Sequence, residues 1–199
     1  AMFGLKFGAR KKAVEGELVI VRLNARLQPM HRGEHFEDPL TEVMEELSLG
    51  EVTGGGTQLS GDDAGVSFCD IELRMPDTGE TALETLIAAL EELGAPKGSK
   101  LLIGDSDDEK PFGTHEGLAL FLNGTGLPDE VYASCDVNHV IAELDRLMDE
   151  KGRFRSYWEG ATDTALYCYG PSFEAMREAI EPLLSGYPLC QKARVEQIA

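Results

Sequence analysis

The sequence predicts an α+β protein built from two consecutive copies of one β-α-β-β-α-β pattern. Apolar residues recur with period two in some segments and at helical spacing in others, and these segments follow the same order on both sides of residues 105–116. The helices that begin at Asp38 and Asp136 start 98 residues apart. A similar turn, with Pro96 in one copy and Pro188 in the other, precedes the last strand of each. Together these observations predict a duplicated unit.

The first copy opens with a half-buried strand. Residues 18–27 alternate between apolar and polar side chains, which is the period-two pattern of a strand with one face in the core. Residues 28–37 are predicted to form a loop. Asp38 followed by Pro39 favours a helix start, and the apolar face that follows ends at Gly50.

The rest of the first copy predicts a hairpin, a helix and a closing strand. Residues 51–59 and 66–75 read as two strands joined by a glycine- and aspartate-rich loop. Asp77 is typical of the first residue of a capping box, and the helix that it opens should end at Gly94. Residues 100–103 form a short last strand.

The segment from Gly104 to Glu116 is predicted to form neither a helix nor a strand. It is polar and acidic, and Pro111 and Gly113 interrupt it. It is therefore interpreted as a linker between the two copies.

The second copy repeats the order of elements. Residues 118–122 form a continuous apolar run, which favours a central strand covered on both faces. A helix from Asp136 to Gly152, a hairpin, and a helix capped by Ser172 follow. Pro182 is expected to kink or shorten the last turn of that helix, and residues 191–198 form the closing strand.

This order of elements resembles the ferredoxin-like split βαβ unit, an antiparallel sheet with two helices packed on one face. The resemblance concerns the fold pattern and implies no specific family. It predicts a division into a basic tail (1–16), a first ferredoxin-like repeat (17–104), an acidic linker (105–116) and a second repeat (117–199). Because the outward side chains of the first sheet are polar, we expect the two sheets to join edge to edge into one continuous sheet.

The charge of the chain is strongly negative. The formal net charge is −18 over 199 residues, with −11 in residues 17–104, −4 in 105–116 and −6 in 117–199. Such a body repels phosphate backbones, so nucleic acid is not an expected partner, whereas a basic protein is. No apolar run is long enough to span a bilayer, so we expect no membrane partner and a cytoplasmic protein. The oligomeric state is left open.

The four cysteines predict buried thiols. Cys69, Cys135, Cys168 and Cys190 lie far apart without any CxxC spacing, so a zinc or thioredoxin-type site is not expected. Cys69 and Cys168 fall inside apolar strand patterns, where a free cysteine acts as a small hydrophobe. No cofactor is predicted.

The densest cluster of polar side chains precedes the first predicted helix. The candidate ligand- or partner-binding residues in it are His31, Arg32, Glu34, His35 and Asp38. The two histidines could bind a metal if the segment were helical, but Gly33 and the missing HExxH signature favour a solvated loop. His31 and His35 are therefore only weak metal candidates.

The second candidate region combines three glycines with two aromatic residues. Gly54, Gly55 and Gly56 lack the Gly-Lys-Ser/Thr ending of a phosphate loop, so they favour a β-bulge or a close backbone approach within a strand. The comparable strand of the second copy carries Tyr157 and Trp158. We expect one of these rings to cover the glycines, or the gap to form a ligand groove.

The sequence leaves three classes of function. An acidic binding protein that engages a basic protein partner, in the manner of an inhibitor or an immunity protein, is expected first because no catalytic motif is recognisable. The second is an ACT-like sensor that binds a small molecule between the repeats, through the loops at 28–37 and 124–135. The third is a metal-dependent enzyme that uses the His31/His35 segment.

Overall fold

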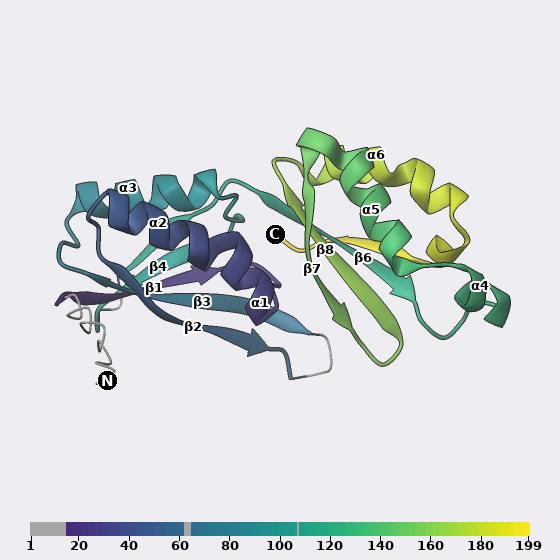
Figure 1. The fold of residues 1–199 in the computed structure, drawn as a ribbon, viewed down its shortest axis with the longest axis horizontal. Helices are drawn as coiled ribbons and strands as arrows, with labels where there is room; N and C mark the ends of the chain where they lie inside the picture. The colour runs from purple at the N-terminus through teal and green to yellow at the C-terminus, as the bar shows by residue number, and fades with distance from the viewer. Residues whose placement is uncertain (1–14, 62–64, 107) are drawn as a thin grey trace, which may run out of the picture.

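The computed structural model describes residues 15–61, 65–106 and 108–199, so most of the predicted basic tail lies outside the described residues. Two separate antiparallel sheets lie side by side (Figure 1). The first has the order β2-β3-β1-β4-β5, and its strands are β1 (Glu17–Leu23), β2 (Glu51–Leu59), β3 (Val66–Met75), β4 (Ser99–Ile103) and β5 (Glu109–Phe112). We call β1 to β5 and their helices the first unit.

The second sheet and its helices form the second unit. Its strands have the order β7-β8-β6-β9 and are β6 (Glu116–Asn123), β7 (Arg153–Glu159), β8 (Asp163–Gly170) and β9 (Arg194–Gln197). Order and strand direction match those of β2-β3-β1-β4 in the first unit, which is consistent with a duplicated unit.

The helices of each unit lie on one face of its sheet (Figure 1). Those of the first unit are α1 (Pro29–Arg32), the π-helix η1 (Gly33–Glu37), α2 (Asp38–Glu46) and α3 (Glu80–Glu92). Those of the second are α4 (Asp129–Ser134), α5 (Val137–Met148), η2 (Asp149–Lys151), α6 (Phe173–Gly186) and η3 (Pro188–Cys190). None of the described helices is long and apolar enough to cross a membrane. The predicted fold class, tandem ferredoxin-like units in an α+β protein, is confirmed.

The predicted loop at residues 28–37 is wrong, because this segment is helical. Pro29 stands in the first turn of α1, where its missing N–H costs no hydrogen bond. Gly33 adopts helical φ and ψ of −54° and −59°, so it does not break the helix. A proline inside a helix removes one hydrogen bond and crowds the preceding turn, and the wider π-turn of η1 lies just before Pro39. The helix therefore begins nine residues before Asp38, and Asp38 is not a cap.

The predicted linker also contains a strand. β5 pairs with β4, with Lys100 opposite Pro111, and forms an edge of the first sheet. An edge strand tolerates proline because its outer backbone groups need no partner. The prediction of no strand in this segment is therefore wrong.

Two smaller expectations about helix ends are also corrected. α3 begins at Glu80 with Gly79 as its cap, and Asp77 instead accepts a 2.8 Å hydrogen bond from the Gly79 N–H. Pro182 does not shorten α6, which continues to Gly186.

Both units carry a β-bulge at the same place. In β2 the pairing with β3 skips Thr53, and in β7 the pairing with β8 skips Arg155, each the third residue of its strand. This confirms the bulge expected near the glycines. A bulge redirects a side chain away from the regular alternation, and Arg155 uses this freedom to reach the first unit.

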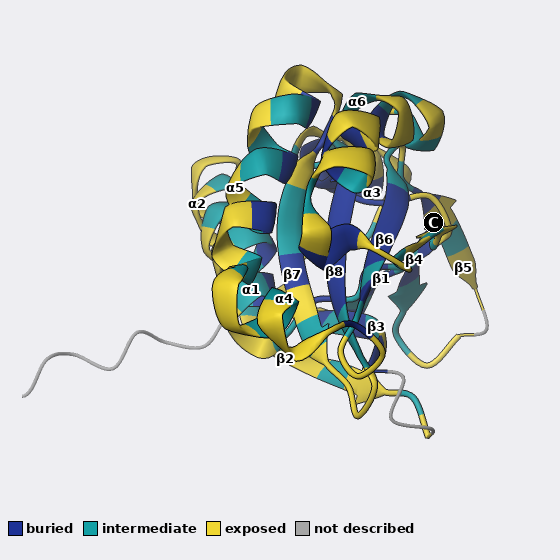
Figure 2. Cartoon of the chain, turned by 90° about the vertical axis from the view of Figure 1, so that its right-hand side faces the viewer, coloured by how far each residue is buried: buried dark blue, intermediate teal, exposed yellow. Residues whose placement is uncertain are grey.

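The two units do not join into one sheet, contrary to the expectation. β6 and β8 are buried on both faces, as Figure 2 shows in dark blue. Their Leu118, Leu120 and Leu166 pack under α5 and α6, while Ala119 and Tyr169 on the opposite face join the core of the first unit. The open face of the second sheet is thus partly covered by the first unit, which avoids exposing its apolar side chains. The expected covered strand at 118–122 is confirmed.

Candidate functional site

The junction between the units is built on the chain that leaves β1. The backbone N–H of Arg26 donates to the Tyr169 hydroxyl at 2.7 Å, and the N–H of Gln28 donates to Ser156 Oγ at 3.1 Å. The Gln28 side-chain amide donates to the Tyr157 carbonyl at 2.6 Å. Ala25 and Leu27 are buried between these hydrogen bonds. We call residues 25–28, which the bonds hold against the second sheet, the strap.

The predicted histidine cluster lies at this junction. His31 Nδ1 is 2.9 Å from the buried Ser156 Oγ, and its ring meets Tyr157 edge-on at a centroid distance of 5.8 Å. The His31 and His35 rings stack at 6.3 Å. The buried serine is closed off by Gln28 and His31, so this pair holds the units together and does not resemble an accessible nucleophile.

His35 is held at both ring nitrogens by Arg155. Its Nε2 lies 3.1 Å from the Arg155 carbonyl oxygen, and its Nδ1 lies 3.1 Å from the Arg155 guanidinium. One neutral tautomer satisfies both contacts, with Nε2–H donating and Nδ1 accepting. Burial and the Arg155 charge lower the pKa of His35, because protonation would place a second positive charge against the guanidinium.

These contacts leave the metal alternative without support. Both nitrogens of His35 and one of His31 face the second unit. In the part of the chain that the structure describes, no three His, Cys, Asp or Glu side chains gather closely enough to hold a metal ion.

Arg32 and Gly55, both predicted candidates, come together behind the cluster. The Arg32 side chain is buried and donates to Glu37 Oε1 at 2.5 Å and to Thr57 Oγ1 at 2.6 Å. A Cβ at Gly55 would lie 2.4 Å from the Glu37 carboxylate and 3.0 Å from Arg32 Nε. The glycine therefore allows the Arg32–Glu37 ion pair to approach the backbone, as its strand context predicts.

The expected cover of the glycines by an aromatic ring is wrong. Trp158 packs against Gly65 in the β2–β3 hairpin, where an added Cβ would lie 2.8 Å from the indole. A Cβ at Gly54 would meet Glu72, and one at Gly56 would meet nothing within 4 Å. Sequence comparison paired the correct strands but could not tell which residues face each other across the junction.

The remaining candidates are exposed. Glu34 and Asp38 lie on the outer side of η1 and at the start of α2. Tyr157 is 36% exposed, and Met30, next to His31, is 75% exposed. An exposed methionine and tyrosine therefore flank the junction where the units meet.

Three of the four cysteines lie in the interior, and Cys135 is partly exposed. Cys69, Cys168 and Cys190 are buried, which raises the pKa of Cys69 to about 12 and that of Cys190 to about 11. Thiols with such raised pKa values are poor nucleophiles at neutral pH. The buried-thiol prediction for Cys69 and Cys168 is confirmed.

Sequence reasoning missed a cleft on the uncovered part of the second sheet. The cleft has a volume of about 460 Å³. Its wall combines the aromatic residues Phe121, Trp158 and Tyr167, the cations Arg26 and Arg194, the carboxylates Asp163 and Glu196, and the turn residues Gly160, Ala161 and Thr162 with Ala165. The loops at 28–37 and 124–135, expected to bind a small molecule, do not line it. Only the unusual density of aromatic residues in the second copy could have pointed to it.

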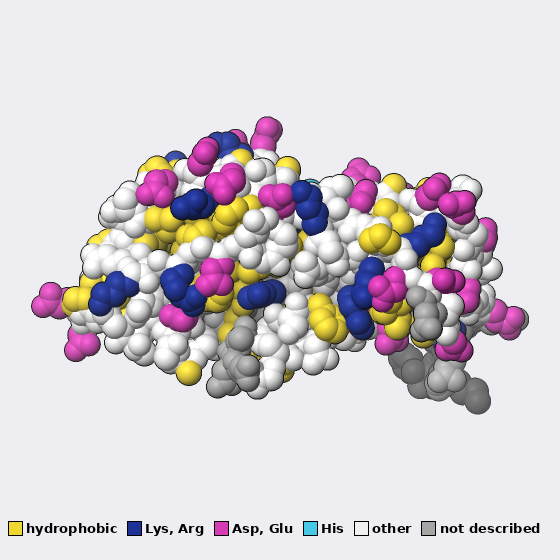
Figure 3. Space-filling view, turned by 180° about the vertical axis from the view of Figure 1, so that it is seen from behind, with side chains coloured by type: hydrophobic (Ala, Val, Ile, Leu, Met, Phe, Trp, Pro, Cys, Tyr) yellow, Lys and Arg dark blue, Asp and Glu magenta, His cyan; other side chains and the backbone are white. Residues whose placement is uncertain are grey.

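The negative charge is concentrated on the helices. The helical segments hold nineteen acidic and four basic residues, a balance of −15 within the total of −18, whereas the strands hold nine acidic and seven basic. Seen from behind, Lys and Arg side chains lie among Asp and Glu with apolar side chains between them (Figure 3). The two layers of the molecule therefore differ in charge.

The densest part of this charge is the outer side of η1, α2 and α3. We call its exposed carboxylates the acidic face: Glu34, Asp38, Glu42, Glu45, Glu46, Glu80, Glu84 and Glu92. Glu42, Glu46, Glu84 and Glu92 form no ion pair with any described residue, and Glu80 has only a 3.9 Å contact with Lys110. Half of the carboxylates of this face therefore have no ion-pair partner among the described residues.

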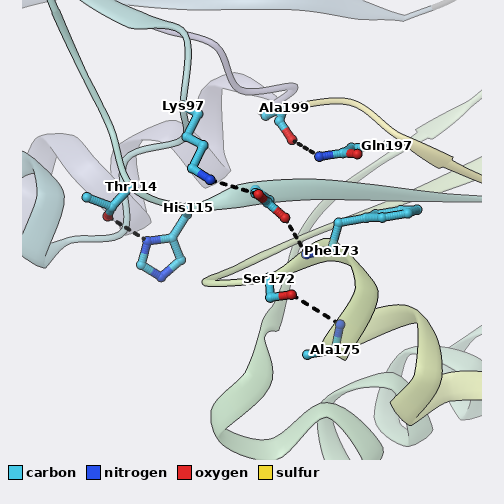
Figure 4. A network of polar contacts seen from close by, with 9 residues as sticks. Lys97, Thr114, His115, Ser172, Phe173, Ala175, Gln197 and Ala199 are labelled. Atoms are coloured by element: carbon cyan, nitrogen blue, oxygen red, sulfur yellow. Dashed lines mark hydrogen bonds and ion pairs between the residues drawn. The ribbon is translucent and has the colours of Figure 1, made fainter.

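A second set of polar contacts fastens the units at Glu116. One carboxylate oxygen accepts from Lys97 Nζ at 2.7 Å and the other from the Phe173 N–H at the start of α6, also at 2.7 Å (Figure 4). The Lys97 ammonium and the Phe173 N–H lower the pKa of Glu116. Glu116 thus links Lys97, in the turn before β4 of the first unit, to the start of α6 in the second unit.

The His35–Arg155 contact predicts a pH dependence of stability. The pKa of His35 is lowered in the folded protein, so the unfolded chain binds more protons as the pH falls below about 6.5. The contribution of the neutral ring is complete above that pH and is lost as the pH falls toward the folded pKa. When thermal unfolding is measured between about pH 8 and pH 5, the Tm of His35→Gln should fall less on acidification than the Tm of the wild type.

The matched control is His139→Gln, which changes an exposed histidine on α5. His115, whose pKa is also lowered by burial and by Arg155, is present in all three proteins and cancels in the comparison. Parallel Tm curves for the wild type and His35→Gln would show that this contact does not carry the dependence.

No protein-family model matches the chain, and no curated protein resembles it in sequence. Three similar solved structures have TM-scores below 0.3. The first two RRM domains of the yeast poly(U) binding protein Pub1 are 11% identical, with a TM-score of 0.24 over 92% of this chain and 99% of that one. An anthrone oxidase-like protein is 15% identical, with a TM-score of 0.24 over 92% and 90%. A protein described as a monooxygenase from Lactobacillus acidophilus NCFM is 9% identical, with a TM-score of 0.28 over 91% of each chain.

Proposed function

We propose that this chain is a binding protein that engages a basic protein partner through its acidic face, in the manner of an inhibitor or an immunity protein. The observation that carries the proposal is the separation of charge, with nearly all of the net negative charge on the helices and little on the strands. A surface whose charges served only hydration would need no such separation of charge between helices and strands. A concentrated field of one sign steers an oppositely charged partner and speeds its association.

The surface beside the acidic face supports the same function. Exposed Met30 and Tyr157 stand at the junction, and Leu47 at the end of α2 is 52% exposed. Protein interfaces commonly combine a few apolar or aromatic anchors with a charged rim that excludes water and sets orientation. The predicted candidates Glu34, Asp38 and Tyr157 would contact the partner in this arrangement. The buried Arg32 and the half-buried His31 and His35 would support this surface from below.

The acidic face can be tested by charge reversal. A triple variant, Glu42→Lys, Glu84→Lys and Glu92→Lys, should slow association with the basic partner isolated from source cells by at least about tenfold, because the steering field is removed. Raising the ionic strength from about 0.05 M to about 0.5 M should slow the wild-type association similarly. Surface plasmon resonance measures both rates.

The control variant keeps the change of net charge and moves it to the second unit, at Asp129→Lys, Glu130→Lys and Glu150→Lys. All three control positions are exposed. Equal slowing by both triple variants would show that total charge, and not the acidic face, governs association. Recovery of no basic protein by the wild type at low salt would contradict the proposal itself.

A further inference from the structure

The cleft on the second sheet contains a buried polar group without a partner. Tyr167 is fully buried, and its hydroxyl forms no hydrogen bond with any described residue. Arg26 lies nearby, with its guanidinium carbon 5.7 Å from the ring centroid. Burial raises the pKa of Tyr167 and the adjacent Arg26 opposes that rise, but no atom of Arg26 meets the distance and angle of a hydrogen bond to the hydroxyl. An unsatisfied buried hydroxyl costs about 1–3 kcal/mol, so such a group in a native protein calls for a partner.

The two arginines of the cleft differ in their ion pairs: Arg194 has carboxylate partners and Arg26 has none among the described residues. Arg194 pairs with Glu196 and lies 3.4 Å from Asp163, and its guanidinium stacks over the Phe121 ring at 4.5 Å. Arg26 forms no ion pair with any residue that the structure describes. The cleft therefore offers a single unpaired positive charge, close to the single unpaired hydroxyl.

The wall also has an apolar part. Phe121 and Trp158 contribute aromatic rings and Ala165 a small side chain, and Arg194 lies over the Phe121 ring. Aromatic walls bind flat apolar groups well because stacking adds to the burial of area. The volume of about 460 Å³ falls within the range of small-molecule sites, roughly 300–1,000 Å³.

We propose that this cleft binds a flat aromatic acid with one negative charge. Its carboxylate contacts the Arg26 guanidinium and accepts a hydrogen bond from the Tyr167 hydroxyl, and its ring packs against Trp158 and Phe121. A nucleotide does not fit this chemistry, because Arg194 is already paired with Asp163 and Glu196 and leaves only Arg26 to offset its further negative charges. The site is separate from the acidic face, so it stands independently of the proposed partner.

The only tryptophan of the chain lines the cleft and reports on binding. Titration with 2-naphthoate, followed by Trp158 fluorescence and by calorimetry, should show saturable binding to one site. The uncharged 2-naphthamide and the non-aromatic hexanoate should each bind at least about tenfold more weakly. The first lacks the charge for Arg26, and the second lacks the ring.

Two cleft variants and one control complete the test. Arg26→Gln should weaken 2-naphthoate binding at least about tenfold and Tyr167→Phe by about three- to tenfold. Arg22→Gln, which changes an arginine paired with Asp70 on the first sheet, should leave it unchanged. Without ligand, Tyr167→Phe should not lower the Tm, because the lost hydroxyl has no partner among the described residues.

Several results would overturn the assignment. One is that neither 2-naphthoate nor any of a panel of aryl carboxylates changes the Trp158 emission or gives calorimetric heat. Another is equal binding of acid and amide, or binding that Arg26→Gln leaves intact. A lowered Tm of unliganded Tyr167→Phe would show that the hydroxyl already has a partner in the protein.

Discussion

Replacing Tyr169 with alanine should lower the free energy of unfolding by about 3–5 kcal/mol, the cost typical of truncating a buried aromatic residue. Tyr169 is only 5% exposed, and it belongs to the core shared by the two units. Its hydroxyl also accepts the 2.7 Å hydrogen bond from the Arg26 N–H, across 143 residues of sequence. The variant removes both the packing and the bond that fasten the strap to the second sheet.

Urea unfolding followed by circular dichroism measures this effect, and its shape carries further information. If the shared core couples the units, Tyr169→Ala should broaden or split the transition as the units begin to unfold separately. Tyr169→Phe keeps the ring and should cost only about 1–2 kcal/mol, for the Arg26 N–H left unsatisfied. A wild-type midpoint for Tyr169→Ala would contradict the shared core.

Replacing Gly113 with alanine should cost about 3 kcal/mol or more. Gly113 has a φ of +109°, which side chains rarely tolerate, and an added Cβ would lie 1.9 Å from the Pro96 carbonyl oxygen. Its N–H donates to Glu91 at 3.0 Å, so the turn after β5 cannot move away without losing that bond. The clash is with backbone atoms, which leaves no flexible side chain to give way.

Gly186→Ala, in α6, is the matched control for this substitution. A Cβ there would meet nothing within 4 Å and its φ is not positive, so the change should be neutral or slightly stabilising. The two variants differ only in where the methyl group is placed. Equal melting temperatures for both would show that the turn after β5 is not constrained as described.

The spacing of apolar and charged residues along the sequence was enough to predict the regular strands and helices of this fold. β2 and β3 begin and end where the sequence predicts; β3 buries one face, whereas no residue of β2 is fully buried. The helical start at Pro29 was missed because Gly33 and two prolines are poor helix signals, and tertiary contacts of His31, Arg32 and His35 outweigh them. β5 was missed because an edge strand needs only one partner and tolerates Pro111.

The candidate residues were recognised as a polar cluster, but their roles depended on the second unit. His35 is explained by Arg155, 120 residues away, and Gly55 by the Arg32–Glu37 pair. The cleft joins Arg26 to Tyr167 and Arg194 across still longer separations. Local sequence patterns contain no information about contacts between residues so far apart, so these contacts could not be predicted from a single sequence.

The sequence by itself determined that the protein has two α+β units of one pattern, an acidic surface and cysteines in the core, because period and composition decide which side chains must be buried. Only the tertiary structure decided how the units meet. The open face of the second sheet is apolar along Ala119, Tyr167 and Tyr169, and the first unit covers just part of it. The uncovered part of that face is the cleft. The shape of the first unit and the angle at which it packs on the second sheet decide where the covered part ends, and no local sequence pattern encodes either.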